Sequence, residues 1–228
     1  FITNDAQEQR EQFILVNSTK PLPKSLIYEL LPYTETRLTN ALQKKRFPAR
    51  LLDELNYRDD SKLNGMIKTA TNPDGIIKDN SILKFIENSI TEGALYRFRD
   101  PETGEGDVEN MLELMGNFWR AVADVFPSSW GLDPRKSRLM HGAGITAMGH
   151  VMDAISDRYH SERQVDITSY DEFRNDLEML SPFCKWSNGY WNFGSERKVK
   201  WNELQNISKD INLLTHFLLY KYRVEVWR

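Results

Sequence analysis

The chain has 228 residues, of which 40% are hydrophobic and 28% are charged. This composition is typical of a globular protein and excludes a disordered or fibrous chain. The formal net charge of −3 excludes a domain that is basic over its whole surface, as many nucleic-acid-binding domains are, but leaves local basic patches open. A chain of this length can bury a substantial core, as one domain or as two small ones.

The cysteine content and the hydropathy of the chain indicate the cellular compartment in which it resides. The single cysteine, Cys184, excludes an intramolecular disulfide and a cysteine-based zinc site. We interpret Cys184 as a small buried thiol, because no nearby histidine could activate it as a nucleophile. No window approaches the roughly 18 apolar residues that span a bilayer, and the start lacks a signal-peptide pattern. We therefore expect a cytoplasmic protein with no membrane partner.

The first helical patterns of the chain are short and are separated by prolines. Asn4 can cap a first helix, which Pro21 interrupts. A second helix is predicted from Pro23 to the proline at position 32. Pro48 then predicts two further helices, over about 34–46 and 48–55, because proline disrupts the interior of a helix.

Turn and cap signals divide the middle of the chain. Residues 72–75, Asn-Pro-Asp-Gly, form a strong turn signal. A helix is predicted from position 79 or 80, with Gly93 at its C-terminal cap. The exposed acidic loop at 100–107 is the predicted internal hinge.

The second half of the chain shows the strongest helical periodicity. Apolar residues at helical spacing predict a helix over 108–126, and a second long pattern runs over 137–159. Ser169 and Glu172 form a capping box for a helix ending at position 180, and Asn202 with Gln205 is the predicted cap of the last helix. Short strands are predicted at 1–3, 67–69, 94–99 and 190–193. The expected fold is mainly α, a bundle-like helical body with a few short strands.

Residues 7–32, QEQREQFILVNSTKPLPKSLIYELLP, place a polar turn between two helical patterns. This segment resembles the one that follows the signature Asp-Gly-Gln-His-Arg in DGQHR-domain proteins, a bacterial group that includes the DndB-like proteins. The similarity continues through residues 117–120, 126–127, 137–144 and 201–205. The signature itself does not occur in these 228 residues.

The resemblance implies an organisation and a function. Residues 1–32 would be the end of a truncated ParB-like α/β subdomain, which is sulfiredoxin-related, and residues 33–228 a helical domain, with two lobes hinged near 100–107 as one alternative. The implied function is that of a DNA-associated regulatory or accessory protein in a bacterial DNA-modification or defence system of the phosphorothioation or 7-deazaguanine type. Its partners would be DNA and other proteins of that system. No cofactor is expected in this chain.

Two other functions stay open. One is a nucleotide-hydrolysing subunit, whose catalytic DGQHR turn would lie upstream of Phe1 and which would use ATP in the intact protein. The other is a helical protein-interaction domain. No complete catalytic constellation and no clustered metal ligands occur in the sequence, so no metal site is expected.

Five residues are candidates for a phosphate-binding pocket. Asn17, Ser18 and Lys20 offer amide, hydroxyl and ammonium donors, and the alternative is a polar turn that caps the next helix. Arg138 and His141 lie at helical spacing, where Arg138 could hold a phosphate or pair with Asp133. The glycines that follow at 142, 144 and 149 predict a small-residue surface for close helix packing.

Two basic runs are candidates for nucleic-acid binding. The first is Lys44, Lys45 and Arg46, with Arg50 close by. The second is Arg197, Lys198 and Lys200, which follows aromatic residues at 186, 190, 191 and 193 and precedes Trp201. Cations mixed with aromatic rings suit a nucleic acid strand, while the alternative is that these rings form core.

Overall fold

The structure is a computed structural model that describes residues 23–34, 39–103, 105–194 and 198–227. Most of the described residues are helical, which confirms the predicted mainly α fold. Predictions on residues 1–22, including Asn17, Ser18 and Lys20, lie outside the described residues. The elements are α2 (Lys24–Leu30), α3 (Asn40–Tyr57), β1 (Ile67–Lys68), β2 (Ile77–Lys78), α4 (Asp79–Glu92), α5 (Val108–Val125), α6 (Gly142–Arg163), α7 (Tyr170–Leu180), β3 (Tyr190–Asn192), β4 (Lys198–Lys200) and α8 (Ser208–Lys221).

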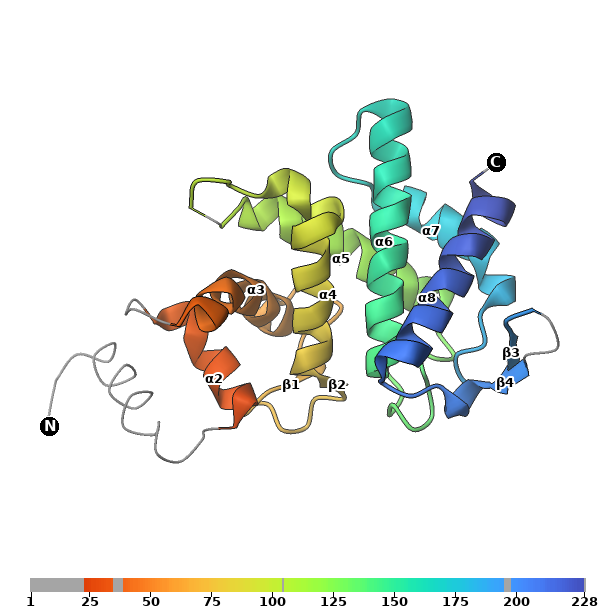
Figure 1. Cartoon of the computed structure of the whole chain (residues 1–228), viewed down its shortest axis with the longest axis horizontal. Helices are drawn as coiled ribbons and strands as arrows, with labels where there is room; N and C mark the ends of the chain where they lie inside the picture. Colours follow the sequence, from red (N-terminus) through yellow and green to blue (C-terminus); the bar gives the residue numbers. More distant parts are fainter. Residues whose placement is uncertain (1–22, 35–38, 104, 195–197, 228) are drawn as a thin grey trace, which may run out of the picture.

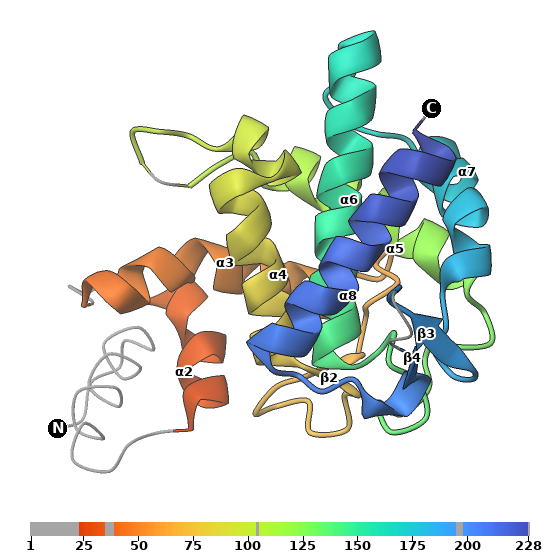
Figure 2. The same cartoon turned by 45° about the vertical axis from the view of Figure 1, so that its right-hand side comes forward.

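The helices form a row with two more helices packed against it. α3, α4, α6 and α8 lie side by side in that order, and α5 pairs with α7 (Figure 1). α4, α6 and α8 run in the same direction, so their N-terminal ends lie at one end of the molecule in both views (Figures 1 and 2). The antiparallel hairpin β3–β4 lies beside that end, and β1 and β2 form a separate, parallel pair.

α5 supplies the centre of the core. Its apolar residues recur at helical spacing, and the structure confirms the predicted helix at 108–126 within one residue. Trp119 packs edge-to-face on Phe85 of α4 with ring centroids 5.6 Å apart, and Phe118 packs on Phe173 of α7 at 5.2 Å. One apolar cluster therefore includes α4, α5 and α7.

α3 is one helix, so the predicted break at Pro48 is wrong. Pro48 lies inside the helix, although it lacks the N–H that would bond to the carbonyl of Lys44. Phe47 is 5% exposed and Leu51 is fully buried, so both sides of the proline are held by packing. The apolar burial of the continuous helix outweighs one lost hydrogen bond.

α6 begins at Gly142, five residues later than the pattern at 137–159 suggested. The preceding segment is irregular because Arg138 donates its backbone N–H to the carbonyl of Trp186, at 2.8 Å. The predicted small-residue surface is confirmed at Gly149, where a Cβ atom would lie 2.4 Å from a ring carbon of Phe85. α4 and α6 therefore approach each other closely at this point.

Two further boundaries differ from the predictions. The predicted strand at 94–99 is a 3-10 helix, Ala94–Phe98, whose first N–H donates to the carboxylate of Asp153 at 2.9 Å. The last helix begins at Ser208, so Asn202 and Gln205 do not cap it. Gln205 instead donates its backbone N–H to Asp210 at 2.9 Å. The capping box of Ser169 and the strands near 67 and 190 are confirmed.

The loop at 100–107 is tied to the helical body. Asp100 donates its N–H to the carbonyl of Glu105 at 2.8 Å, and Asp107 donates to Phe98 at 2.9 Å. The Glu105 carboxylate accepts from Arg46 of α3 at 3.0 Å. A hinge at this loop stays a prediction. Among the described helices, none combines the length and the apolar composition that crossing a membrane requires.

Candidate functional site

The first basic run forms part of a pocket between α3, α4 and the loop near 99–105, which we call the basic pocket. Its volume is about 620 Å³, within the range of small-molecule sites. Lys45 donates to Glu87 at 2.6 Å, and Arg46 pairs with Glu105. Lys44 and Arg99 also line it, and neither has an acidic partner among the described residues. The basic pocket therefore keeps two cations available for an anion.

The wall of the basic pocket is partly apolar. Phe47 and Ile90 line it and are 5% and 8% exposed. Arg99 lies 5.8 Å above the ring of Tyr96, which holds its guanidinium in place. Arg99 was not predicted as a site residue, because nothing in its local sequence shows that it faces the run at Lys44. An anion with an apolar part matches this arrangement.

The second basic run lies on one face of the β3–β4 hairpin. Tyr190 pairs with Lys200, and Asn192 pairs with Lys198. Residues directly opposite each other in a sheet point to the same side, so these four side chains share a face, which we call the hairpin face. All four are exposed, and Tyr190 is 59% exposed. Arg197 lies outside the described residues.

The opposite side of the hairpin is locked into the core. Trp191 is fully buried, with its ring 5.0 Å from that of Trp186 and 5.8 Å from that of Phe217. Trp186 and Trp191 therefore form core, as the alternative interpretation held. Phe193 and Trp201 are half-buried against that core, and Tyr190 is the exposed aromatic residue of this segment. This packing makes the hairpin face a rigid support for its lysines.

The lysines of the hairpin face carry free charge. Neither Lys198 nor Lys200 has an ion pair with another described residue. Among the described residues, the acidic group nearest in sequence is Glu203, whose carboxylate accepts the backbone N–H of Lys200 at 3.0 Å and so turns toward the main chain. The hairpin face therefore presents two ammonium groups beside one aromatic ring.

Arg138 and His141 are part of the packing rather than of an open pocket. The Arg138 guanidinium donates to the carbonyls of Leu204 at 2.8 Å, Pro134 at 2.6 Å and Asn202. Asp133 pairs with Arg135 instead. A phosphate role for Arg138 stays a prediction that these bonds do not favour.

His141 caps α6 through its ring nitrogen Nδ1, which accepts the N–H of Ala143 at 3.5 Å. Burial, together with the nearby charges of Arg138 and Lys78, lowers its pKa to about 4. The imidazole is therefore neutral at physiological pH and offers no positive charge to a phosphate.

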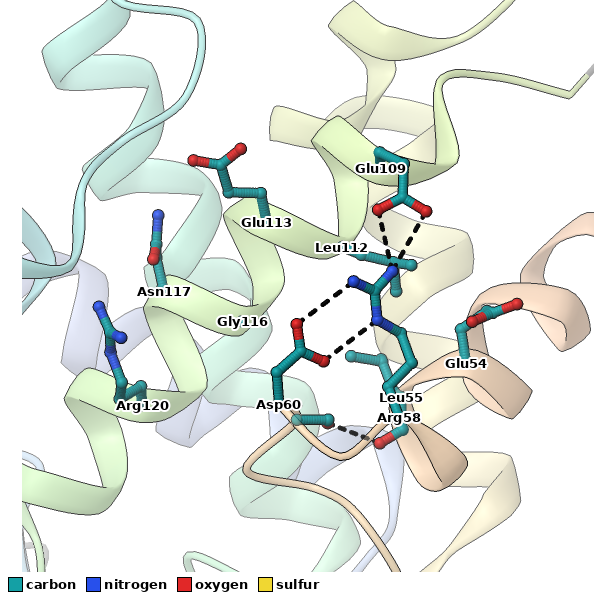
Figure 3. A pocket seen from close by; sticks show the side chains of 11 residues that line it. Glu54, Leu55, Arg58, Asp60, Glu109, Leu112, Glu113, Gly116, Asn117 and Arg120 are labelled. Atoms are coloured by element: carbon teal, nitrogen blue, oxygen red, sulfur yellow. Dashed lines mark hydrogen bonds and ion pairs between the residues drawn. The ribbon is translucent and has the colours of Figure 1, made fainter.

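A third concave region lies between α3 and α5 and has a volume of about 330 Å³ (Figure 3). Arg58 lines this region and donates hydrogen bonds to Asp60 at 3.1 Å and to Glu109 at 2.9 Å. These bonds raise the pKa of Arg58 and lower that of Asp60. Arg120 on the same wall lies 4.3 Å from the ring of Tyr170. Four carboxylates and two guanidinium groups line this region, so it is acidic overall and offers no anion site comparable to the basic pocket.

Nucleophilic and metal chemistry find little support in the described part of the chain. Burial raises the pKa of the Cys184 thiol to about 12, so it stays protonated at neutral pH. No group of three or more potential ligands that could hold a metal ion occurs within the described ranges.

Comparison with known proteins finds no family model, no curated protein and no solved structure that matches the chain. The resemblance to DGQHR-domain proteins therefore stays a prediction. The hairpin face and the basic pocket are two surfaces of the described chain that present cations to a ligand.

Proposed function

We propose that this protein is a DNA-associated regulatory or accessory protein that contacts the nucleic acid backbone through the hairpin face. The observation that carries the proposal is the placement of Lys198 and Lys200 beside Tyr190, on a hairpin whose other side is buried. Lysines that neutralise phosphates release counterions, and an exposed aromatic ring can stack on an unpaired base. The two effects together favour a nucleic acid strand over a simple anion.

The overall charge shapes the expected binding. With a formal net charge of −3, most of the surface does not attract DNA, so contacts are confined to local patches. We therefore expect moderate affinity with a shallow salt dependence that reflects few phosphate contacts. From the resemblance to DGQHR-domain proteins, we propose that the protein acts in a bacterial DNA-modification or defence system. That system would be of the phosphorothioation or 7-deazaguanine type.

The test is a DNA-binding titration with charge-matched variants. Fluorescence anisotropy with labelled duplex and single-stranded DNA, at several salt concentrations, would compare the wild type with K198E/K200E. Loss of two phosphate contacts should lower duplex affinity at least tenfold and reduce the magnitude of the log K against log salt slope by about 2. K62E/K68E is the control, because both lysines are exposed, form no ion pair with a described residue and lie in or near β1. Equal losses in the two double variants would contradict the proposal.

The basic pocket supports a second candidate function, nucleotide binding. Lys44 and Arg99 form no ion pair within the described ranges and lie beside an apolar wall, as a nucleotide's phosphates and base would require. Titration with ATP, followed by calorimetry, should show binding that K44E/R99E weakens at least fivefold while K198E/K200E leaves it unchanged. Absence of saturable binding by the wild type would remove this candidate.

A further inference from the structure

The N-terminal ends of α4, α6 and α8 bring partial positive charge to one end of the molecule. All three helices have their N-terminal ends there (Figures 1 and 2). The first N–H groups of a helix have no partner within the helix, and the aligned peptide dipoles place a partial positive charge at that end. Three parallel helices therefore direct their positive ends toward the same region.

A cavity of about 370 Å³ lies between the first turns of α4 and α8, and we call it the helix-start pocket. α4 contributes Ser81 and Lys84, and α8 contributes Ser208. Asn206, which precedes α8, also lines it, and its amide packs directly against Gly142 at the start of α6. The pocket is therefore bordered by the starts of all three helices.

The first turn of α8 has free hydrogen-bond donors. Its N-cap residue is Ile207, which has no side-chain acceptor, so no side chain caps the helix. The N–H groups of residues 210 and 211 bond to the carbonyl of Ile207, at 3.1 and 3.0 Å. Those of Ser208 and Lys209 have no acceptor among the described residues. Two adjacent donors are therefore left at the start of α8, and one of them belongs to Ser208, which lines the pocket.

Ser81 gives an independent indication of a ligand. It is only 4% exposed, it lines the pocket, and its hydroxyl group has no hydrogen-bond partner within the described part of the chain. A buried hydroxyl without a partner is unfavourable, because it loses its bonds to water. Lys84 is exposed on the next turn of α4 and forms no ion pair with any described residue. An acceptor-rich anion would satisfy both groups.

Two carboxylates in the same helical turns have other contacts. Asp79 accepts the N–H of Asn80 at 2.6 Å through one oxygen, while its other oxygen is buried and has no hydrogen-bond partner within the described part of the chain. Asp210 accepts the N–H of Gln205 at 2.9 Å. Neither residue lines the pocket. Lys84 is therefore the one charged side chain that lines the cavity, beside polar side chains that can donate hydrogen bonds.

We propose that the helix-start pocket binds a phosphate group, held by the N–H groups of Ser208 and Lys209, by the Ser81 hydroxyl and by Lys84. A tetrahedral oxyanion accepts several hydrogen bonds at once, and helix N-termini are well suited to it. The phosphate is either a free ion or part of a phosphate ester. This site is separate from the hairpin face and does not depend on the DNA contact proposed there.

The experiment is a titration of the isotope-labelled chain with inorganic phosphate at constant ionic strength, followed by amide chemical shifts. We expect saturable shifts at Ser208 and Lys209. K84Q should weaken binding at least fivefold, and K62Q, which changes an exposed lysine elsewhere, should leave it unchanged. Absence of saturable shifts, or equal binding by K84Q and K62Q, would overturn the proposal.

A second pair of variants tests the backbone donor. Ser208 is the first residue of α8, a position that accepts proline, and the extended backbone of Ile207 suits a residue before proline. S208P removes the N–H and the hydroxyl, whereas S208A removes the hydroxyl alone. Phosphate binding should weaken at least fivefold more in S208P than in S208A, and equal binding would overturn the role of the N–H group.

Competition with duplex DNA distinguishes the sources of the phosphate. Displacement of inorganic phosphate by DNA would support a backbone phosphate as the ligand. Binding of phosphate that DNA does not displace would support a free ion or a small ester. K198E/K200E should retain phosphate binding, so failure of the DNA proposal and failure of this one are distinguishable.

Discussion

At the residue scale, Asp153 shows how a buried charge joins two elements. It lies on α6 and accepts hydrogen bonds from the Ser89 hydroxyl at 2.5 Å and from the Ala94 N–H at 2.9 Å. Burial raises its pKa from 3.8 to about 6, although both hydrogen bonds act in the opposite direction. The carboxylate holds the turn after α4 in place through these hydrogen bonds, but its own charged form is destabilised because burial removes it from water.

The raised pKa predicts how stability depends on pH. Between pH 4 and 6 the folded state binds this proton more tightly than the unfolded state, so the free energy of unfolding falls as pH rises through this window. A shift from 3.8 to about 6 corresponds to a loss of roughly 3 kcal/mol. D153N keeps an oxygen acceptor but removes the titration. Urea unfolding at pH 4 to 7 should therefore show wild-type stability declining relative to D153N.

The control for this prediction is D157N. Asp157 lies one turn further along α6 and is exposed, where it pairs with Arg97 at 2.8 Å. Asp157 adds a smaller like-charge effect to the raised pKa of Asp153, after burial, so its replacement should leave most of the decline of stability with pH in place. A constant difference between D153N and the wild type over the whole range would contradict the assignment to Asp153.

At the element scale, two glycines in helices differ in what surrounds them. Gly149 of α6 has no room for a side chain, because a Cβ atom would lie 2.4 Å from the buried ring of Phe85. Gly116 of α5 lies on the wall of the concave region between α3 and α5 (Figure 3). A Cβ atom at this position would meet nothing within 4 Å. The same substitution should therefore have opposite effects at the two positions.

We predict that G149A destabilises the protein and that G116A stabilises it. The clash at Phe85 forces α4 and α6 apart, at a cost of roughly 1–3 kcal/mol. Alanine at position 116 gains helix propensity of about 0.5–1 kcal/mol and meets no neighbour. Urea unfolding of both variants tests this, and a G149A variant as stable as the wild type would show that the two helices are not in close contact.

Local signals explain which elements were predictable from the sequence. The apolar repeat of α5 and the capping box at Ser169 act within one turn of their own residues, and both predictions are confirmed. Pro48 was misleading because α3 is held by burial of Phe47 and Leu51, which depends on distant helices. β2 and β4 were not predicted, although β1 and β3 are equally short and were, because a strand of two or three residues carries too little pattern to be recognised consistently.

The same distinction applies to the candidate sites. Lys198 and Lys200 alternate about Val199, so their common face follows from strand periodicity. The basic pocket also needs Arg99 and Glu105, which the chain brings to Lys44 through tertiary packing alone. The helix-start pocket depends on the parallel arrangement of three helices, and that arrangement has no local sequence signal.

At the scale of the whole molecule, one apolar cluster extends from Leu31 to Val226 and lies on both sides of the 100–107 loop. Contacts of α4 with α6 and of α3 with α5 cross that loop in sequence, as does the ring contact of Phe85 with Trp119. Two lobes hinged at the loop would need to separate this core. We therefore expect the described part of the chain to unfold as one cooperative unit.

Tryptophan fluorescence can test this expectation, because every tryptophan follows the loop in sequence. The tryptophans are Trp119, Trp130, Trp186, Trp191, Trp201 and Trp227. Fluorescence therefore reports on residues 108–228, whereas far-ultraviolet circular dichroism also reports on α3 and α4. For one cooperative unit, the two signals should give the same urea midpoint and the same m-value. A circular dichroism transition that separates from the fluorescence transition would instead assign the helices before residue 100 to a lobe of their own, since no tryptophan lies in that part of the chain.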